Sequence, residues 1–161
     1  EFYLSTIDVN NHFEDNIMRI EKFKADKVWS AMLYDASQKN CPYLKRFLME
    51  ATAKKQNYLG DNPKNKLIVL SDKAYPRFEV HFTGGDSLRE PLLIDVEEFI
   101  AVKGFKAKGK RVTLFAIDNV VELEPTRFPE GEEPQPEVDE SNNDEEDEPE
   151  ANIGPVELSL F

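Results

Sequence analysis

The sequence has little of the chemistry that builds metal centres, disulfide frameworks or hydrolytic active sites. It contains one cysteine, Cys41, and two histidines, His12 and His81, that lie far apart in a chain of 161 residues. A single cysteine excludes an internal disulfide and favours a reducing compartment. These three side chains are also too few to ligate structural zinc or to pair a nucleophile with a base. We therefore expect no metal site, no cofactor and no catalytic residue in this stretch of chain.

Long apolar runs and an initiator methionine are missing as well. No run reaches the roughly 20 apolar residues that a membrane-spanning helix needs, and the N-terminus has no signal-peptide pattern. The chain begins with Glu1-Phe2-Tyr3, so we expect it to be a piece of a longer protein. These observations predict a cytoplasmic protein without a membrane partner.

Positive charge is absent from the C-terminal part. All 20 lysines and arginines lie at or before Arg127, together with 19 of the 32 acids, so residues 1–127 carry a net charge of +1. Residues 128–161 hold the other 13 acids, among several prolines and few apolar residues. Such a composition buries too little apolar surface to offset the entropy lost on ordering. We therefore expect one folded body, residues 1–127, and an acidic, mostly disordered tail, residues 128–161.

One short segment of the tail has a different pattern. Val156, Leu158 and Leu160 alternate with Glu157 and Ser159. This alternation has the period of a strand, and such a segment could add to an exposed sheet edge. A frayed terminus is the alternative interpretation.

The most informative stretch is residues 99–117. Two apolar runs, residues 99–102 and 112–117, flank nine residues that carry five positive charges and two glycines. This pattern predicts two strands joined by an exposed cationic loop, with a merely solvated turn as the alternative. Because clustered cations repel one another and resist burial, they should face a polyanion. The candidate phosphate contacts are Lys103, Lys106, Lys108, Lys110 and Arg111.

A nucleotide-binding loop is a rival interpretation of the same residues. Gly104 and Gly109-Lys110 have the G-x-x-x-x-G-K spacing of a loop that cradles a triphosphate. Arg111 stands where that loop has Ser or Thr, and the residues after it favour a strand. A strand provides no helix N-terminus for the phosphates, so we reject nucleotide binding here.

A hairpin pattern occurs twice in the preceding sequence. Residues 28–34 and 43–49 form the first predicted pair of strands, and residues 66–72 and 75–82 form the second, with 32 residues between Tyr43 and Tyr75. An internal repeat of this kind predicts an all-β array such as a propeller, although two similar hairpins could arise by coincidence. Lys45, Arg46 and Arg77 lie on these strands and are lesser candidates for DNA contact.

Five stretches together resemble a known family: residues 43–47, 75–80, 89–91, 98–111 and 119–127. They are similar to the C-terminal region of the A subunits of bacterial type IIA topoisomerases, closest to the topoisomerase IV type. The resemblance covers roughly residues 1–127. It implies a β-pinwheel, a propeller-like ring of hairpin-built blades whose basic outer edge binds and bends duplex DNA. This chain would supply two or three blades of that ring.

The family's gyrase box has the pattern Gln-Arg-Arg-Gly-Gly-Lys-Gly, and residues 103–110 stand where it would be expected. They keep its positive charge and its glycine character but lack the Gln, the adjacent arginines and the double glycine. The departure favours engagement of a second DNA segment, for relaxation or decatenation, over full chiral wrapping. The family's DNA-cleaving tyrosine lies in its N-terminal part, and no tyrosine here matches its context.

The resulting hypothesis is a non-catalytic domain that binds and bends double-stranded DNA and supports ATP-dependent strand passage by the full topoisomerase. The resemblance implies association with the nucleoid. It also implies a B subunit with ATPase activity and a second A subunit, both contacted through parts of the parent chain that are absent here. The alternative is a protein-interaction module in which β-hairpins form a docking surface and the acidic tail binds a basic partner.

Overall fold

The computed structural model describes residues 1–5, 15–39 and 41–131. Most of the acidic tail, including residues 156–161, lies outside the described residues, so its predicted disorder stays a prediction. The described chain is mostly β-strand, and the all-β prediction is confirmed. Among the described residues, no helix has the length and apolar character needed to span a bilayer.

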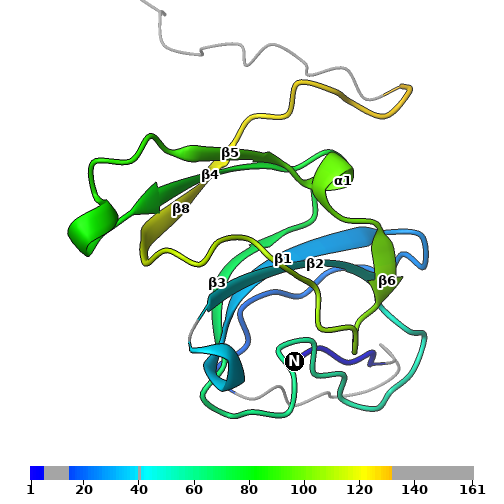
Figure 1. The fold of residues 1–161 in the computed structure, drawn as a ribbon. Coiled ribbons are helices and arrows are strands. Elements are labelled where there is room, and N and C mark those ends of the chain that lie inside the picture. The colour runs from blue at the N-terminus through cyan, green and yellow to red at the C-terminus, as the bar shows by residue number, and fades with distance from the viewer. Residues whose placement is uncertain (6–14, 40, 132–161) are drawn as a thin grey trace, which may run out of the picture.

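The described residues form eight strands and three short helices, and Figure 1 shows how the main elements are arranged. The helices are η1 (Ala36–Gln38), η2 (Gly84–Asp86) and α1 (Val96–Phe99). The strands are β1 (Val28–Asp35), β2 (Cys41–Leu48), β3 (Lys66–Ser71), β4 (Arg77–Phe82), β5 (Leu92–Asp95), β6 (Val102–Gly104), β7 (Lys110–Arg111) and β8 (Ile117–Leu123).

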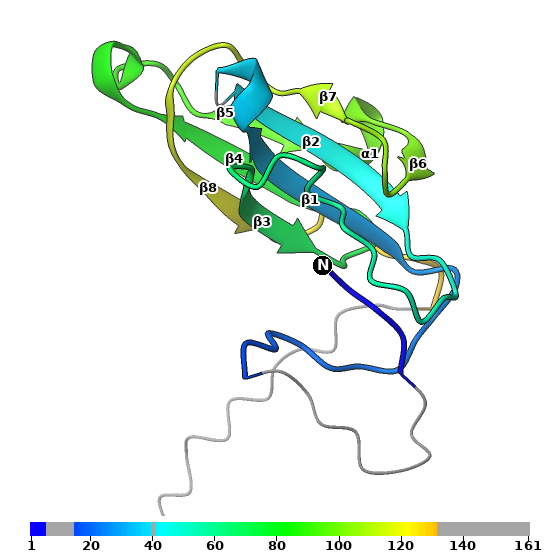
Figure 2. The ribbon, with the colours of Figure 1, turned by 90° about the horizontal axis from the view of Figure 1, so that it is seen from below.

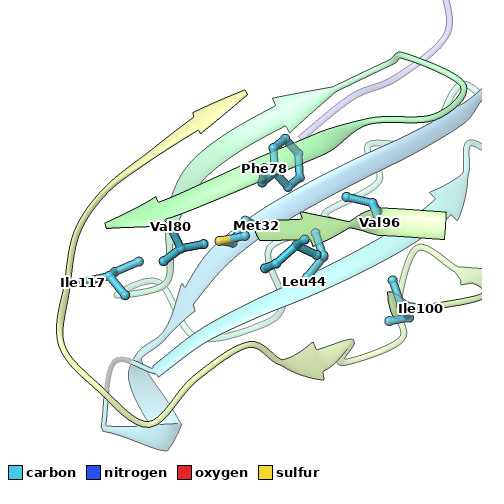
Figure 3. Packing of buried hydrophobic residues seen from close by; sticks show 8 residues of the cluster. Met32, Leu44, Phe78, Val80, Val96, Ile100 and Ile117 are labelled. Atoms are coloured by element: carbon cyan, nitrogen blue, oxygen red, sulfur yellow. The ribbon is translucent and has the colours of Figure 1, made fainter. Parts of the chain in front are cut away.

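The strands form two sheets that lie one above the other in Figure 1. The first sheet has the order β3-β1-β2-β6, and β7 pairs with the same strand β2. The second sheet has the order β5-β4-β8 and is antiparallel throughout. The two sheets enclose one apolar core, in which Met32 and Leu44 of the first sheet pack against Phe78 and Val80 of the second (Figure 3). Ile94 of β5 belongs to the same core.

A second apolar cluster covers the opposite face of the first sheet. Trp29 and Ala31 of β1 and Phe47 of β2 pack there with Tyr58 and Phe105. Because successive residues of a strand point to opposite faces, residues 29 and 31 enter this cluster while residue 32 enters the core between the sheets. The first sheet is therefore buried on both faces, which explains why β1 and β2 are apolar almost without interruption.

The first predicted hairpin is confirmed, and the second is wrong. β1 and β2 pair antiparallel from Val28↔Leu48 to Asp35↔Cys41. Their turn is stabilised by the Asp35 carboxylate, which accepts a hydrogen bond from the Ser37 N–H at 2.9 Å. β3 instead pairs with the other edge of β1, and β4 joins the second sheet. β3 and β4 therefore lie in different sheets and face each other across the core, to which both supply side chains.

The predicted hairpin around the basic residues is also wrong. α1 precedes the stretch, and β6 and β7 both pair with β2 instead of with each other. Residues 112–116, predicted to be part of the second strand, are not a strand. The Val112 N–H donates to the Pro42 carbonyl at 2.8 Å, and the chain then crosses to the second sheet, where β8 begins at Ile117. The open edge of β2 gives this stretch a partner that two mutually repelling cationic strands lack.

Candidate nucleic-acid interface

The basic stretch, residues 102–111, lies along one edge of β2, and we call it the cationic edge. β6 runs parallel to β2, with Phe47 opposite Lys103, and β7 runs antiparallel, with Leu44 opposite Lys110. Between them the Ala107 N–H donates to the Gly104 carbonyl at 3.0 Å and closes a tight turn. Figure 2 shows β6, β7 and α1 gathered on the β2 side of the molecule. The segment is thus fixed by backbone pairing at both of its ends.

Two residues without charge hold the cationic edge against the sheet. Phe105 is 6% exposed and packs into the second apolar cluster, where its ring meets that of Phe2 edge to face at a centroid distance of 6.1 Å. Gly109 has φ of +89°, and a Cβ built there would lie 2.5 Å from the carbonyl oxygen of Leu44. The backbone therefore approaches β2 more closely at this position than any side chain would allow.

Lys45, in β2, connects the first sheet to the cationic edge by a hydrogen bond from its buried side chain. Its side chain is buried among apolar residues, and its Nζ donates to the carbonyl oxygens of Phe105 at 2.5 Å and Tyr58 at 2.8 Å. Burial lowers the pKa of the Lys45 ammonium from 10.5 to about 8. The prediction that Lys45 faces DNA does not fit this position, because no phosphate reaches a side chain that is 3% exposed.

The five predicted loop cations all belong to the cationic edge. Lys103, Lys106, Lys108, Lys110 and Arg111 are all exposed to solvent. The Lys108 Nζ lies 3.8 Å from a carboxylate oxygen of Asp35, and the Lys110 Nζ donates to the Phe99 carbonyl at 3.3 Å. Among the described residues, Lys103, Lys106 and Arg111 make no ion pair with a carboxylate. The edge therefore carries a row of cations with one acidic neighbour, Asp35, close to Lys108.

Arg46 and Arg77 lie apart from this row. Arg46 is buried on the core side of β2, where its Nη1 lies 3.5 Å from the carbonyl oxygen of Ile100, so it too is unavailable to DNA. Arg77 belongs to β4 in the second sheet, is half-buried, and donates to the Glu124 carbonyl at 3.3 Å. The structure brings together the five loop cations and separates from them the three strand cations.

The sequence around Lys45 and Arg46 does indicate that they are buried, although their charge alone suggests exposure. Both stand in the middle of an aromatic and aliphatic run that is buried on both faces, from Pro42 to Phe47. A base flanked on both sides by buried apolar neighbours has no solvent face in a central strand, whichever way it points. Within the described ranges, no cluster of three or more His, Cys, Asp or Glu side chains could hold a metal ion.

Comparison with models of protein families supplies a match over most of the folded body. The family model described as the topoisomerase C-terminal domain of Bacteroidota matches residues 1–124 of this chain. No curated protein and no solved structure matches it.

Proposed function

The chain belongs to the family of topoisomerase C-terminal domains from Bacteroidota, and from that premise we propose that residues 1–127 bind and bend duplex DNA through the cationic edge. In this proposal the domain is part of a type IIA topoisomerase A subunit and performs no chemistry itself. It holds DNA, in association with the nucleoid, while the parent enzyme passes one duplex through another. The B subunit and a second A subunit act through other parts of the parent protein.

The observation that carries the proposal is the row of five exposed cations on a backbone that is fixed at both ends. Pairing with β2, the buried Phe105 ring and the close approach of Gly109 hold the backbone in place before any ligand arrives. All five Lys and Arg side chains are exposed and within reach of phosphates, although Lys108 lies near Asp35 and Lys110 donates to the Phe99 carbonyl. Contacts of this kind position a duplex and carry little sequence information.

The two sheets support a finer proposal about architecture. We infer that they correspond to neighbouring blades of a β-pinwheel, because they pack face to face around one core and the chain crosses between them from β3 to β4 and from β7 to β8. The cationic edge would then form part of the outer rim, where a bent duplex could follow it. The missing neighbours of this pair would come from elsewhere in the parent protein.

DNA binding by the full chain at several salt concentrations tests the proposal. If about five phosphates are neutralised, the logarithm of the affinity for random-sequence duplex DNA should fall against the logarithm of salt with a slope near −4.5. The double variant Lys103→Gln/Lys106→Gln should weaken binding and make the slope shallower by roughly 2. A matched control, Lys24→Gln/Lys64→Gln, removes two exposed lysines elsewhere and should leave the slope unchanged.

The same titration discriminates the alternative, a protein-interaction module. A module that docks proteins and captures a basic partner with its tail has no reason to bind random-sequence duplex. An affinity that ignores salt, or that falls equally in the double variant and in its control, would contradict the proposed interface. Bending is measured separately, from the end-to-end distance of a labelled duplex with and without the protein.

A further inference from the structure

β5 is an open edge of the second sheet. It pairs only with β4, and among the described residues no other segment hydrogen-bonds to the backbone of Leu92–Asp95 from its outer side. Such an edge presents unpaired N–H and C=O groups that can accept another strand. Leu93 in its middle is 58% exposed, so the edge is also apolar where it is free.

An apolar hollow adjoins the start of the same strand. It has a volume of about 560 Å³ and is lined mainly by Phe82, Pro91, Leu92 and Phe115. The guanidinium of Arg89 lies 3.6 Å from the centroid of the Phe115 ring and forms one wall. Next to this hollow, Leu114 is 70% exposed. Free backbone groups beside a hollow that takes apolar side chains are the two features that strand addition uses.

The other outer edges of the sheets are less available. β3 and β8 lie near each other, and the Ser71 hydroxyl donates to the Glu122 carboxylate across the gap. The Lys73 Nζ lies 3.7 Å from a carboxylate oxygen of Glu124 on the same side. The edge of β2 is occupied by β6 and β7, and β6, which ends the first sheet, has only 3 residues, of which one is glycine. β5 is therefore the edge that is most open to an added strand.

The course of the chain after β8 brings the start of the tail to β5. The Arg127 guanidinium donates to the Asp95 carboxylate at 2.7 Å and lies 3.0 Å from a carboxylate oxygen of Glu97. Asp95 is the last residue of β5. The tail thus begins at one end of the open strand. A random coil of 28 residues, the number between Arg127 and Val156, spans on the order of 30 Å, so a segment at that separation would be held near β5 at a millimolar effective concentration.

We propose that residues 156–161 add to the free edge of β5 as a fourth strand of the second sheet. They form the one run after Arg127 in which apolar and polar residues alternate. The backbone of this segment would pair with that of β5. Val156, Leu158 and Leu160 would point to one face and occupy the hollow beside Phe82 and Phe115. This docking closes the acidic part of the tail into a loop on the body, and it does not depend on DNA binding.

Hydrogen exchange of the full chain tests this inference. The variant Leu158→Asp/Leu160→Asp removes the apolar face of the segment. The control Asn152→Asp/Ser159→Asp adds the same two charges to the tail at positions outside that apolar face, one before the segment and one among its alternating polar residues. Because all four changes lie in the tail, the folded body is not at risk. In the wild type and the control, outward-facing amides of Leu92–Asp95 should exchange at least about tenfold more slowly than in the apolar-face variant. Equal exchange in all three proteins would overturn the inference.

Dilution of the protein distinguishes the chain's own tail from a strand donated by a second copy. An intramolecular strand protects β5 equally at all protein concentrations, whereas a strand donated by a second copy is lost on dilution. Exchange measured over a hundredfold range of concentration should therefore be constant. Protection that disappears on dilution would show pairing between copies and would overturn the assignment of the chain's own tail.

Discussion

The Lys45 Nζ lies 2.5 Å from the carbonyl oxygen of Phe105, and this hydrogen bond connects a central strand to the turn of the cationic edge. A second bond, to the Tyr58 carbonyl at 2.8 Å, fixes the same ammonium from the other side. In the proposed interface Lys45 would therefore act through the backbone of Phe105, and it would contribute position rather than a phosphate contact. A charged group in this place also makes stability sensitive to alkaline pH.

The first prediction concerns that pH dependence. Burial lowers the pKa of Lys45 to about 8, so between pH 8 and pH 9.5 the unfolded chain holds a proton that the folded chain has released. Stability rises with pH wherever the unfolded state binds more protons. We expect the free energy of unfolding to increase by about 1–2 kcal/mol over this interval, measured by urea unfolding. A neutral lysine keeps two N–H donors, so both carbonyls stay bonded.

The variant Lys45→Met tests this prediction, and the measurement has an upper pH limit. In Lys45→Met the increase in the free energy of unfolding between pH 8 and pH 9.5 should vanish, because Lys45 is the only lysine that is buried among the described residues. Burial also raises the pKa of the Tyr34 and Tyr58 hydroxyls, which opposes the trend above about pH 10, so the measurement stops below that value. A flat profile in the wild-type protein would contradict the buried position of the ammonium.

The second prediction separates positioning from contact. Lys45→Met leaves the five exposed cations in place, so the slope of log affinity against log salt should stay the same within error. The affinity itself should fall several-fold, because the Phe105 carbonyl loses its donor and the turn is held less firmly. Binding of duplex DNA by both proteins from 50 to 200 mM salt measures both quantities. A slope that becomes shallower by about 1 would instead place Lys45 among the phosphate contacts.

Local patterns predicted the strands better than they predicted their partners. β1, β2, β3 and β4 lie within two residues of the strands predicted from apolar runs at residues 28–34, 43–49, 66–72 and 75–82. Pairing depends on which edges are free in three dimensions. The short connection from Ser71 to Arg77 suggested a hairpin, but each strand found its partner in a different sheet. No property of either segment alone distinguishes these two outcomes.

The exposure of the cationic edge could be predicted from the sequence, but its attachment to β2 could not. Its exposed cations follow from charge, since five bases in nine residues cannot be buried together. Its attachment to β2 depends on Phe105 and Gly109, which in the sequence are simply one more aromatic residue and one more glycine. Charge alone also placed Lys45 and Arg46 on the surface. Only the two-sided burial of β2 explains why their stems and charged groups lie inside.

The third prediction concerns a cluster of ion pairs beside Trp29. The Asp72 carboxylate accepts from Arg19 at 2.5 Å and lies 2.7 Å from the Lys27 Nζ. Burial alone would raise the pKa of Asp72, but these two cations outweigh it and lower the value to about 2. A carboxyl whose folded pKa is depressed stabilises the protein above its unfolded pKa, near 4, and loses that contribution as pH falls toward 2.

We expect this contribution to be about 1 kcal/mol at neutral pH, because the partly exposed carboxylate is screened by solvent. Urea unfolding at pH 7, 4 and 3 should show the wild-type protein losing its advantage over Asp72→Asn as the solution becomes acidic. Asp61→Asn, an exposed carboxylate elsewhere, serves as the control. The idea fails if the difference between the wild type and Asp72→Asn is the same at pH 7 and pH 3.

The fourth prediction concerns the acidic tail. If the cationic edge binds DNA, the 13 acids of the tail should compete with DNA phosphates for it, so deleting residues 128–161 should tighten DNA binding at low salt. The gain should shrink at high salt, where both interactions are screened. A tail of unchanged length with Asp→Asn and Glu→Gln throughout separates charge from bulk and should bind DNA as tightly as the deletion. Equal affinity with and without the tail would leave it as a contribution to solubility only.

The last prediction compares the two glycines of the cationic edge. Gly109 has a left-handed φ of +89°, and a methyl group there would meet the Leu44 carbonyl oxygen at 2.5 Å. Gly104 has no atom within 4 Å of a built Cβ and no left-handed φ. Gly109→Ala should therefore lower the free energy of unfolding by roughly 2–3 kcal/mol, or detach the edge from β2, because backbone strain and a backbone clash add. Gly104→Ala should change it by no more than about 0.5 kcal/mol.

Detachment and global destabilisation can be told apart. If the edge detaches, the amides that pair Lys110 and Arg111 with β2 lose their exchange protection while the β1–β2 amides keep theirs. DNA affinity should then fall as well, although every cation is still present, because the five charges are no longer held in one arrangement. If Gly109→Ala and Gly104→Ala behave alike in stability, exchange and DNA affinity, then the close approach at Leu44 does not position the interface.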